Sequence, residues 1–188
     1  GCTTQLDYDC FKSAFYVLSK LDPKQYLFVN VEPVTMNDAF YQGEVVDHLL
    51  RKLGHFRKQI VFELTEGMKA RDFDYVRRAV HFLKKHGCLF AVDDVAGIGS
   101  KFFLLLSLKP DFLKIDISLG KGISKSRLQQ GLLRRVLEIS HKNGCKVIAE
   151  GIENKKDLDY IREMGISFVQ GFYFSRPRKT LFVFSKPT

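Results

Sequence analysis

Polar side chains that could bind a divalent metal follow each of six short apolar segments in this 188-residue chain. Most of them are carboxylates, and the others are two amides and one lysine. A single polar residue after an apolar segment is common, but six in succession indicate a shared site. In chain order the residues are Asn30, Glu63 with Glu66, Asp93 with Asp94, Lys114 with Asp116, Glu150 with Glu153, and Gln170.

These residue types favour a particular kind of metal chemistry. Carboxylate and amide oxygens suit Mg²⁺ or Mn²⁺, and less readily Ca²⁺. The adjacent Asp93 and Asp94 can serve two metal ions, and two ions ~3.5–4 Å apart can activate water and stabilise the leaving oxygen of a phosphate ester. Lys114 can neutralise developing negative charge or hold a water molecule. Zinc is not expected, because no histidine follows any of these segments.

The elements that must position these residues alternate between helix and strand. Residues 84–93 and 141–150 have the same pattern, in which a helix end and a glycine precede a strand and a carboxylate, as in the βα unit of a parallel sheet. The apolar spacing predicts strands over 26–31, 59–64, 88–92, 112–115, 146–149 and 167–169, with one more strand at 181–184. Helices are expected over 7–21, 45–53, 72–87, 102–108, 127–144 and 154–165.

This order of elements predicts one α/β domain over residues 1–188 with a TIM-like β/α barrel. The carboxyl ends of the strands in such a barrel open on one face, where active sites lie. A closed barrel of eight strands usually needs ~250 residues. With six clear strands in 188 residues, the barrel is expected to be incomplete.

The chain carries a formal net charge of +9 at pH 7. Nucleic-acid binding is one explanation of such a charge. However, the basic residues are scattered over predicted helices, where solvated faces are the simpler interpretation, so direct DNA binding is not expected. The positive charge would also steer an anionic ligand towards the protein.

The cysteines and the hydropathy favour a cytoplasmic location. The four cysteines fit no zinc spacing, and Cys88 and Cys145 are expected to be buried as small core residues. Nothing in their spacing suggests a disulfide framework, which favours a reducing compartment. No apolar run is long enough to span a bilayer.

Five short motifs give the chain a family resemblance. In order and spacing, they resemble the EAL-domain family of bacterial cyclic di-GMP phosphodiesterases, which are signal-transduction enzymes. The resemblance extends from Leu6 to Pro177. The motifs are Phe62–Glu66, Val92–Asp94, Leu113–Asp116, Ala149–Glu153 and Gln170–Phe172.

The resemblance implies a β/α barrel that binds cyclic di-GMP and hydrolyses it to linear pGpG with Mg²⁺ or Mn²⁺, as two ions. Lys114 resembles the catalytic lysine that positions the attacking water, and Glu150 can share the role of the base. Glu66 resembles the residue that anchors the loop after Asp94, while Gln170, Asp116 and Glu153 are expected to support the site. By motif position the metal ligands are Asn30, Glu63, Asp93, Asp94 and Glu150.

Two features depart from the family pattern. The Glu-Ala-Leu motif lies on a first strand that would precede the helix starting near Leu6, so the barrel is expected to be incomplete at its N-terminus. This chain alone is therefore expected to show weak or no turnover. The loop after Asp94 reads Val95 to Lys101 as VAGIGSK, where the family usually has Phe-Gly-Thr-Gly-Tyr-Ser-Ser. That loop couples dimer contacts to metal binding in the family.

Three hypotheses for the function follow. The first is an active phosphodiesterase, supported by the nearly complete set of metal ligands. The second is an inactive EAL-like domain that acts as a cyclic di-GMP receptor or a protein-interaction scaffold, supported by the altered loop and the missing strand. The third is a barrel enzyme with another phosphorylated substrate. The resemblance also implies a homodimer and accompanying sensory domains as partners.

Overall fold

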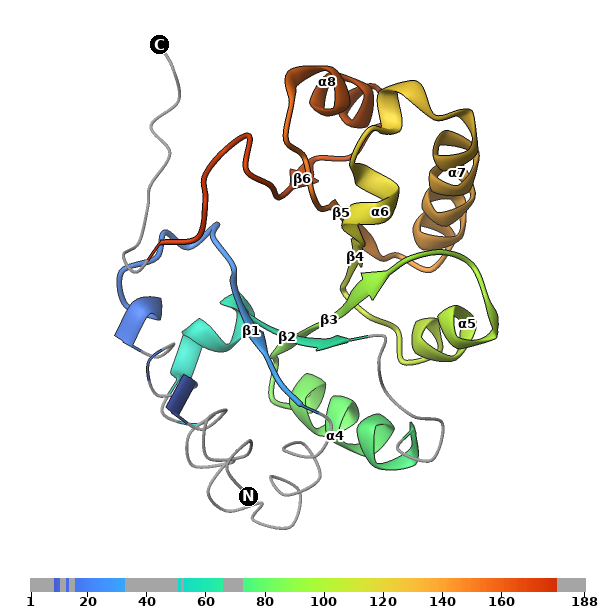
Figure 1. The fold of residues 1–188 in the computed structure, drawn as a ribbon. Coiled ribbons are helices and arrows are strands. Elements are labelled where there is room, and N and C mark those ends of the chain that lie inside the picture. Colours follow the sequence, from blue (N-terminus) through green and yellow to red (C-terminus); the bar gives the residue numbers. More distant parts are fainter. Residues whose placement is uncertain are drawn as a thin grey trace.

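A computed structural model describes residues 9–10, 13, 16–32, 51, 53–65 and 73–178 of the chain. Six strands form one sheet, in which every neighbouring pair is parallel and the strand order follows the sequence (Figure 1). This confirms the predicted parallel α/β architecture. The strands are β1 (Leu27–Asn30), β2 (Ile60–Thr65), β3 (Leu89–Val95), β4 (Phe112–Ile115), β5 (Lys146–Ala149) and β6 (Phe168–Val169).

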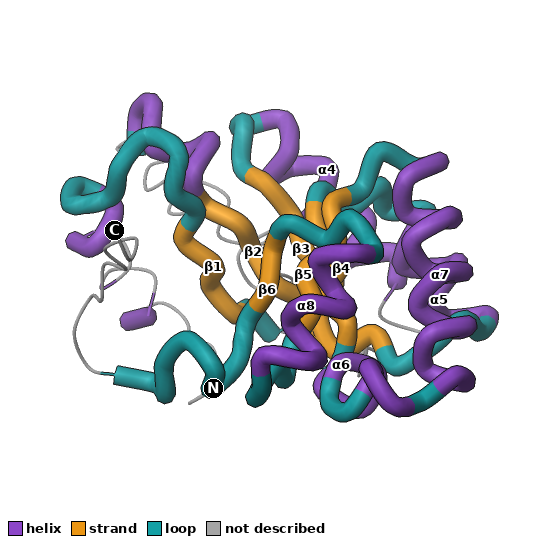
Figure 2. The backbone as a smooth tube through the Cα atoms, turned by 90° about the horizontal axis from the view of Figure 1, so that it is seen from above, coloured by secondary structure: helices purple, strands orange, loops and turns teal. Residues whose placement is uncertain are grey.

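Helices connect the strands and cover the outer face of the sheet (Figures 1 and 2). Apolar residues of α4, such as Val76 and Val80, join Leu64 and Val92 of the sheet in the main core. None of the described helices has the length and apolar character needed to cross a bilayer. The helical segments are η1 (Gly54–Gln59), α4 (Phe73–Lys85), α5 (Ser100–Leu106), α6 (Ile117–Gly120), η3 (Ile123–Lys125), α7 (Arg127–Lys142) and α8 (Lys155–Glu163).

The inner face of the sheet has its own small core around the ring of Phe112. Val61, Ala91 and Ile148 pack in this cluster. The ring of Phe112 contacts the ring of Phe28 on β1, with centroids 5.3 Å apart, and the ring of Phe168 on β6, with centroids 5.7 Å apart. The sheet is therefore curled so strongly that its first and last strands both contact the ring of Phe112.

The barrel is nevertheless open among the described strands. β1 pairs with β2 and β6 pairs with β5, and no described pairing joins β1 to β6. This confirms the expectation of an incomplete β/α barrel. Figure 2 shows the curled strands with helices α5 and α7 to one side.

The predicted boundaries differ from the structure in a few places. The helix expected over 102–108 is α5, which begins at Ser100 because Gly99 serves as its extended N-cap and ends at Leu106. Three short helical segments, η1, α6 and η3, were not predicted, since six, four and three residues are too few to show a clear helical period. The strand expected at 181–184 and most of the helix expected at 45–53 lie outside the described residues.

Cys88 and Cys145 are buried free cysteines, as predicted. Burial raises the pKa of each thiol to about 12, so both remain protonated at neutral pH. They therefore serve as small core residues rather than as nucleophiles or metal ligands.

A buried carboxylate, Asp157, ties α8 to the turn before α7. It accepts hydrogen bonds from the backbone N–H of Gly122 (2.9 Å), from the N–H and hydroxyl of Ser124 (3.0 and 2.6 Å), and from the Asn154 amide (2.7 Å). Asn154 caps α8 in return by accepting from the Asp157 N–H at 3.0 Å. Burial alone would raise the pKa of Asp157, but the donors at Ser124, Gly122 and Asn154 outweigh it and lower the pKa.

Replacing Asp157 with asparagine should therefore destabilise the fold. In Asp157→Asn, the new amide N–H₂ faces hydrogen-bond donors that the carboxylate had accepted from. Losing these hydrogen bonds should lower the free energy of unfolding by about 1–3 kcal/mol. Because the folded pKa lies below the unfolded value of about 3.9, the carboxylate stabilises at neutral pH and this contribution is lost as the pH falls below about 4.

Urea unfolding at pH 7 and near pH 3 measures this effect. The difference between wild type and Asp157→Asn should be large at pH 7 and should shrink in acid. Asp159→Asn is the control, because Asp159 is an exposed partner of Lys155 at 2.7 Å and should contribute little. Equal unfolding midpoints for the two variants would contradict the role of Asp157.

Candidate metal and phosphate-ester site

One buried ammonium group holds three carboxylates together at the carboxyl end of the sheet. Lys114 Nζ lies 3.1 Å from Glu63, 3.0 Å from Asp93 and 2.9 Å from Glu150. Lys114 and Glu63 are each only 5% exposed. The residues come from β2, β3, β4 and the end of β5, as the sequence pattern predicted. These four predicted site residues therefore do meet in space.

Strand alternation explains why these side chains converge. Successive side chains of a strand point to opposite faces, so residues two apart share a face. Six of the predicted site residues, one for each strand, stand two positions after a residue of the inner apolar cluster or one packed against it. The pairs are Phe28 and Asn30, Val61 and Glu63, Ala91 and Asp93, Phe112 and Lys114, Ile148 and Glu150, and Phe168 and Gln170. The inner face thus carries an apolar layer and, one step nearer the mouth, a polar layer.

The charges of this cluster are strongly coupled. Burial raises the pKa of Glu63 and of Glu150, and the nearby ammonium of Lys114 offsets this only in part. Burial alone would lower the pKa of Lys114, but its hydrogen bond to Glu150 and the charges of Glu63 and Asp93 outweigh it and raise the pKa. Lys114 therefore stays positively charged at neutral pH.

Two carboxylates of this cluster, together with Asp94, form a set of three that fits a divalent cation. One oxygen each from Asp93, Asp94 and Glu150 lies within 4.8 Å of the others. The register of β3 against β4 shifts between Val92 and Val95, and Asp94 has φ of 59°. This irregularity lets two successive aspartates serve one site. The donor set is all oxygen, as Mg²⁺ or Mn²⁺ requires.

Asn30 is placed beside Glu63 by the sheet register. It pairs with Glu63 at the end of β1 and is exposed at the mouth. An amide oxygen there could complete a metal site. Glu66, which was expected to anchor the loop after Asp94, lies outside the described residues.

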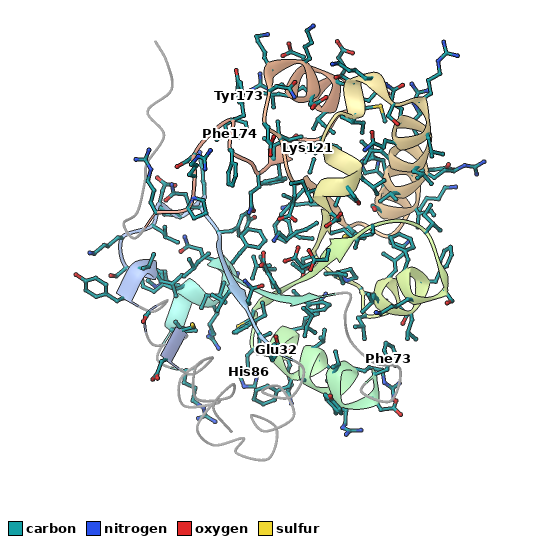
Figure 3. The ribbon with its side chains drawn as sticks, viewed as in Figure 1. Glu32, Phe73, His86, Lys121, Tyr173 and Phe174 are labelled. Atoms are coloured by element: carbon teal, nitrogen blue, oxygen red, sulfur yellow. The ribbon has the colours of Figure 1, made fainter. Side chains whose placement is uncertain are left out.

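The remaining predicted residues surround the cluster without touching Lys114. Asp116 caps α6 by accepting a hydrogen bond from the Ser118 N–H at 2.8 Å. Glu153 forms an exposed ion pair with Lys121 at 3.0 Å, and Lys121 is labelled beside α6 in Figure 3. Gln170 joins β6 to its neighbours through its backbone, donating to Ala149 and accepting from Ile152.

A small cavity beside Glu150 opens to the mouth of the sheet. Its volume is about 200 Å³, and Glu150, Glu153 and Gln170 line it together with the exposed ring of Phe172. The Arg176 guanidinium lies 4.9 Å from the centre of that ring. The cavity thus joins the carboxylate cluster to an aromatic surface and a cation.

No sequence pattern indicated that Gly120 helps to position Glu150. A Cβ atom on Gly120 would collide with the backbone oxygen of Glu150, so only glycine lets α6 pack this closely. Gly151, next to Glu150, has φ of 71° and packs against Ile117 of α6. The only available signal was the short Gly-Lys-Gly segment after Asp116, which resembles an ordinary turn.

Removing the central ammonium should destabilise the protein when metal is absent. Lys114→Met leaves three carboxylates without their counter-ion, two of them buried, and breaking a buried ion pair in this way costs about 3–5 kcal/mol. Mn²⁺ should recover part of the loss, since a divalent cation also neutralises the cluster. Thermal unfolding in EDTA and in excess Mn²⁺ measures both effects. Lys121→Met, which removes an exposed lysine, is the control, and equal melting temperatures for both variants in EDTA would refute the assignment.

Crowding Gly120 should weaken metal binding without touching a ligand side chain. Gly120→Ala pushes on the backbone of Glu150, so Mn²⁺ affinity measured by calorimetry should fall. Gly131→Ala is the control, because Gly131 lies in α7 with open space around it and alanine there should stabilise the helix by up to about 1 kcal/mol. Unchanged Mn²⁺ affinity in Gly120→Ala would show that the close approach does not position Glu150.

Comparison with known proteins identifies similar sequences and structures. The chain is 28% identical over 149 residues to the cyclic di-GMP phosphodiesterase PdeL of Escherichia coli (strain K12), an alignment covering 79% of this chain and 41% of PdeL. The chain therefore spans less than half of that relative. It also matches the solved structure of Klebsiella pneumoniae BlrP1 in a manganese and cyclic di-GMP complex, with a TM-score of 0.78 and 27% identity over 93% of this chain and 45% of that one.

A second solved structure is similar over most of its own length. The EAL domain of Mycobacterium smegmatis DcpA matches with a TM-score of 0.77 and 27% identity, covering 92% of this chain and 77% of that chain. The family model described as EAL domain matches residues 1–177. The chain therefore belongs to the EAL domain family.

Proposed function

We propose that this chain is a phosphodiesterase domain that hydrolyses cyclic di-GMP to linear pGpG in bacterial signalling. The observation that carries the proposal is the buried cluster of Lys114 with Glu63, Asp93 and Glu150 at the mouth of the sheet. Family membership, the name of the relative PdeL and the manganese and cyclic di-GMP complex of BlrP1 support it.

The proposed cofactor is a pair of Mg²⁺ or Mn²⁺ ions. Asp93, Asp94 and Glu150 would hold metal, joined by Glu63 and by Asn30 beside them. Metal bound there would supply an activated water and would stabilise the leaving oxygen. The all-oxygen donor set supports these ions.

The residues of the chain have distinct proposed roles in this reaction. Lys114 carries a fixed positive charge and can donate a hydrogen bond to the attacking water or to a phosphoryl oxygen. Glu150 can accept the proton of that water, because burial raises its pKa towards the range that suits a general base. Gln170 and Glu153 line the cavity beside Glu150 and would orient the ligand there.

The wider assignments are also proposals. A cytoplasmic location is supported by the buried free thiols of Cys88 and Cys145. Accompanying sensory domains are supported by the 41% share of PdeL that the chain covers. A homodimer would be expected to use the loop after Asp94, by family resemblance.

An assay of this chain with cyclic di-GMP and Mn²⁺, with pGpG as the measured product, tests the proposal. Asp93→Asn and Glu63→Gln should each lower turnover by more than about 100-fold. Mutating even the residues that hydrogen-bond to metal ligands typically lowers metal affinity or activity by about 10–100-fold. Glu138→Gln, which alters an exposed partner of Lys142 on α7, should leave turnover unchanged.

The same assay, combined with a binding measurement, distinguishes the enzyme from the second candidate function, a cyclic di-GMP receptor or protein-interaction scaffold. The sequence VAGIGSK in the loop after Asp94 favours a receptor that binds without cleavage. Saturable binding of cyclic di-GMP without pGpG would show that this chain acts as a receptor and not as an enzyme. Neither binding nor product would leave the protein-interaction scaffold and the barrel enzyme with another phosphorylated substrate as the remaining hypotheses. The weak turnover expected for this chain by itself is measured in the same experiment.

A further inference from the structure

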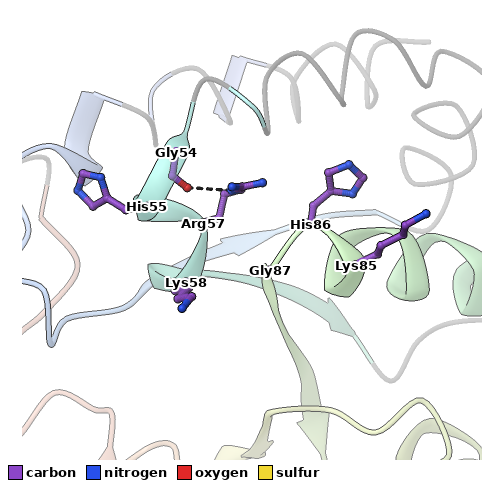
Figure 4. A pocket seen from close by; sticks show the side chains of 7 residues that line it. All are labelled: Gly54, His55, Arg57, Lys58, Lys85, His86 and Gly87. Atoms are coloured by element: carbon purple, nitrogen blue, oxygen red, sulfur yellow. Dashed lines mark hydrogen bonds between the residues drawn. The ribbon is translucent and has the colours of Figure 1, made fainter.

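A basic cavity lies at the opposite end of the sheet from the carboxylate cluster. It encloses about 290 Å³, which is near the lower limit for small-molecule pockets. One side is η1, which leads directly into the amino end of β2, and the other side is the segment between α4 and β3. The lining residues are Gly54, His55, Arg57, Lys58, Lys85, His86 and Gly87 (Figure 4).

The lining of this cavity is uniformly suited to anions. The described lining residues are three permanent cations, two imidazoles and two glycines, with no acidic residue among them. Across the part of the chain that the structure describes, no ion pair joins Arg57, Lys58 or Lys85 to a carboxylate. Their charges are therefore available to a ligand.

Arg57 is oriented for this role by its own helix. Its Nε donates a hydrogen bond to the Gly54 carbonyl at 2.8 Å, which leaves the two terminal nitrogens of the guanidinium for other acceptors. Figure 4 shows Arg57 and His86 standing on the same side of the ribbon, while Lys58 points the other way. A half-buried guanidinium in a fixed orientation is well suited to bidentate contact with phosphate.

The basic surface continues along α4. A neighbouring depression of about 450 Å³ is lined by Arg77, Arg78, His81, Phe82 and Lys85, so Lys85 belongs to both cavities. Arg78, His81, Phe82 and Lys85 follow the i, i+3, i+4, i+7 spacing of one helix face. An anion with more than one phosphate group could therefore reach from the first cavity towards α4.

A simpler explanation accounts for only part of this arrangement. Lysines near a helix C-terminus interact favourably with the helix dipole, and this explains Lys84 and Lys85. The helix dipole does not explain why cations from η1 and α4 line one cavity with no acidic residue among its described lining residues. A recessed hollow also fits a discrete phosphate group better than a flat anionic surface.

We propose that the cavity between η1 and the end of α4 is a second site of this protein, which binds the phosphate or pyrophosphate group of a soluble ligand. Arg57 and Lys85 supply the charge, and His86 lines the cavity beside them. The site is separate from the carboxylate cluster and does not depend on the proposed phosphodiesterase activity.

Calorimetric titration of the whole chain with sodium pyrophosphate tests this site. EDTA is present throughout, so that no metal at the carboxylate cluster can bind the anion. We expect saturable binding with one ligand per chain that weakens as salt is added. The double variant Arg57→Gln with Lys85→Gln should lose at least about tenfold in affinity, as expected for lost charge-assisted hydrogen bonds.

The matched control removes the same two charges elsewhere. Lys142→Gln with Lys155→Gln alters exposed ion pairs on α7 and α8 and should keep the wild-type affinity. The ring resonances of His86 should also shift during the titration, whereas those of His141 on α7 should not. Equal losses in both double variants would overturn the proposal, since they would show only an effect of net charge.

Two further outcomes would overturn the proposal. One is the absence of saturable pyrophosphate binding at low salt. The other is binding to phosphatidylglycerol vesicles or to a short oligonucleotide, abolished in the Arg57→Gln, Lys85→Gln variant, with no binding of pyrophosphate. That result would assign the basic surface to a macromolecule instead. Thermal unfolding of the variant confirms that any loss comes from the site and not from misfolding.

Discussion

One ammonium group among three carboxylates is the interaction on which the site depends. A buried charge is costly unless it is paired and hydrogen-bonded. Lys114 meets Glu63, Asp93 and Glu150 within 3.1 Å, although these residues are far apart in the sequence. Their meeting requires parallel strands whose carboxyl ends lie level, so the sheet register and the charge cluster support each other.

The two layers inside the sheet explain how a polar site coexists with a stable fold. Phe112 gathers Phe28 and Phe168 around its ring, and this apolar layer closes the interior below the charges. Strand alternation then places Lys114 directly above Phe112 on the same face. The outer face packs against the helices in a separate core, so the polar layer does not interrupt the main hydrophobic contacts.

The two ends of the sheet carry opposite charge. Carboxylates gather at the carboxyl ends of the strands, and Arg57, Lys58 and Lys85 gather near the amino ends of β2 and β3. A net charge of +9 therefore does not describe the surroundings of the metal site. The positive charge can still draw an anionic ligand towards the protein, while the carboxylate cluster at the mouth selects for a cation first.

The sequence alone determined the parallel α/β architecture, the six strands and the residues at their ends, because strand periodicity and glycine stops are local signals. It could not determine that Lys114 contacts three carboxylates at once, which depends on sheet register across four strands. The short helical segments η1, α6 and η3 were missed because they are too short to show a helical period. The constraint on Gly120 was missed because close packing between distant segments leaves no local pattern. The basic cavity was missed for the same reason: its cations appeared to be scattered until the fold brought η1 beside the end of α4.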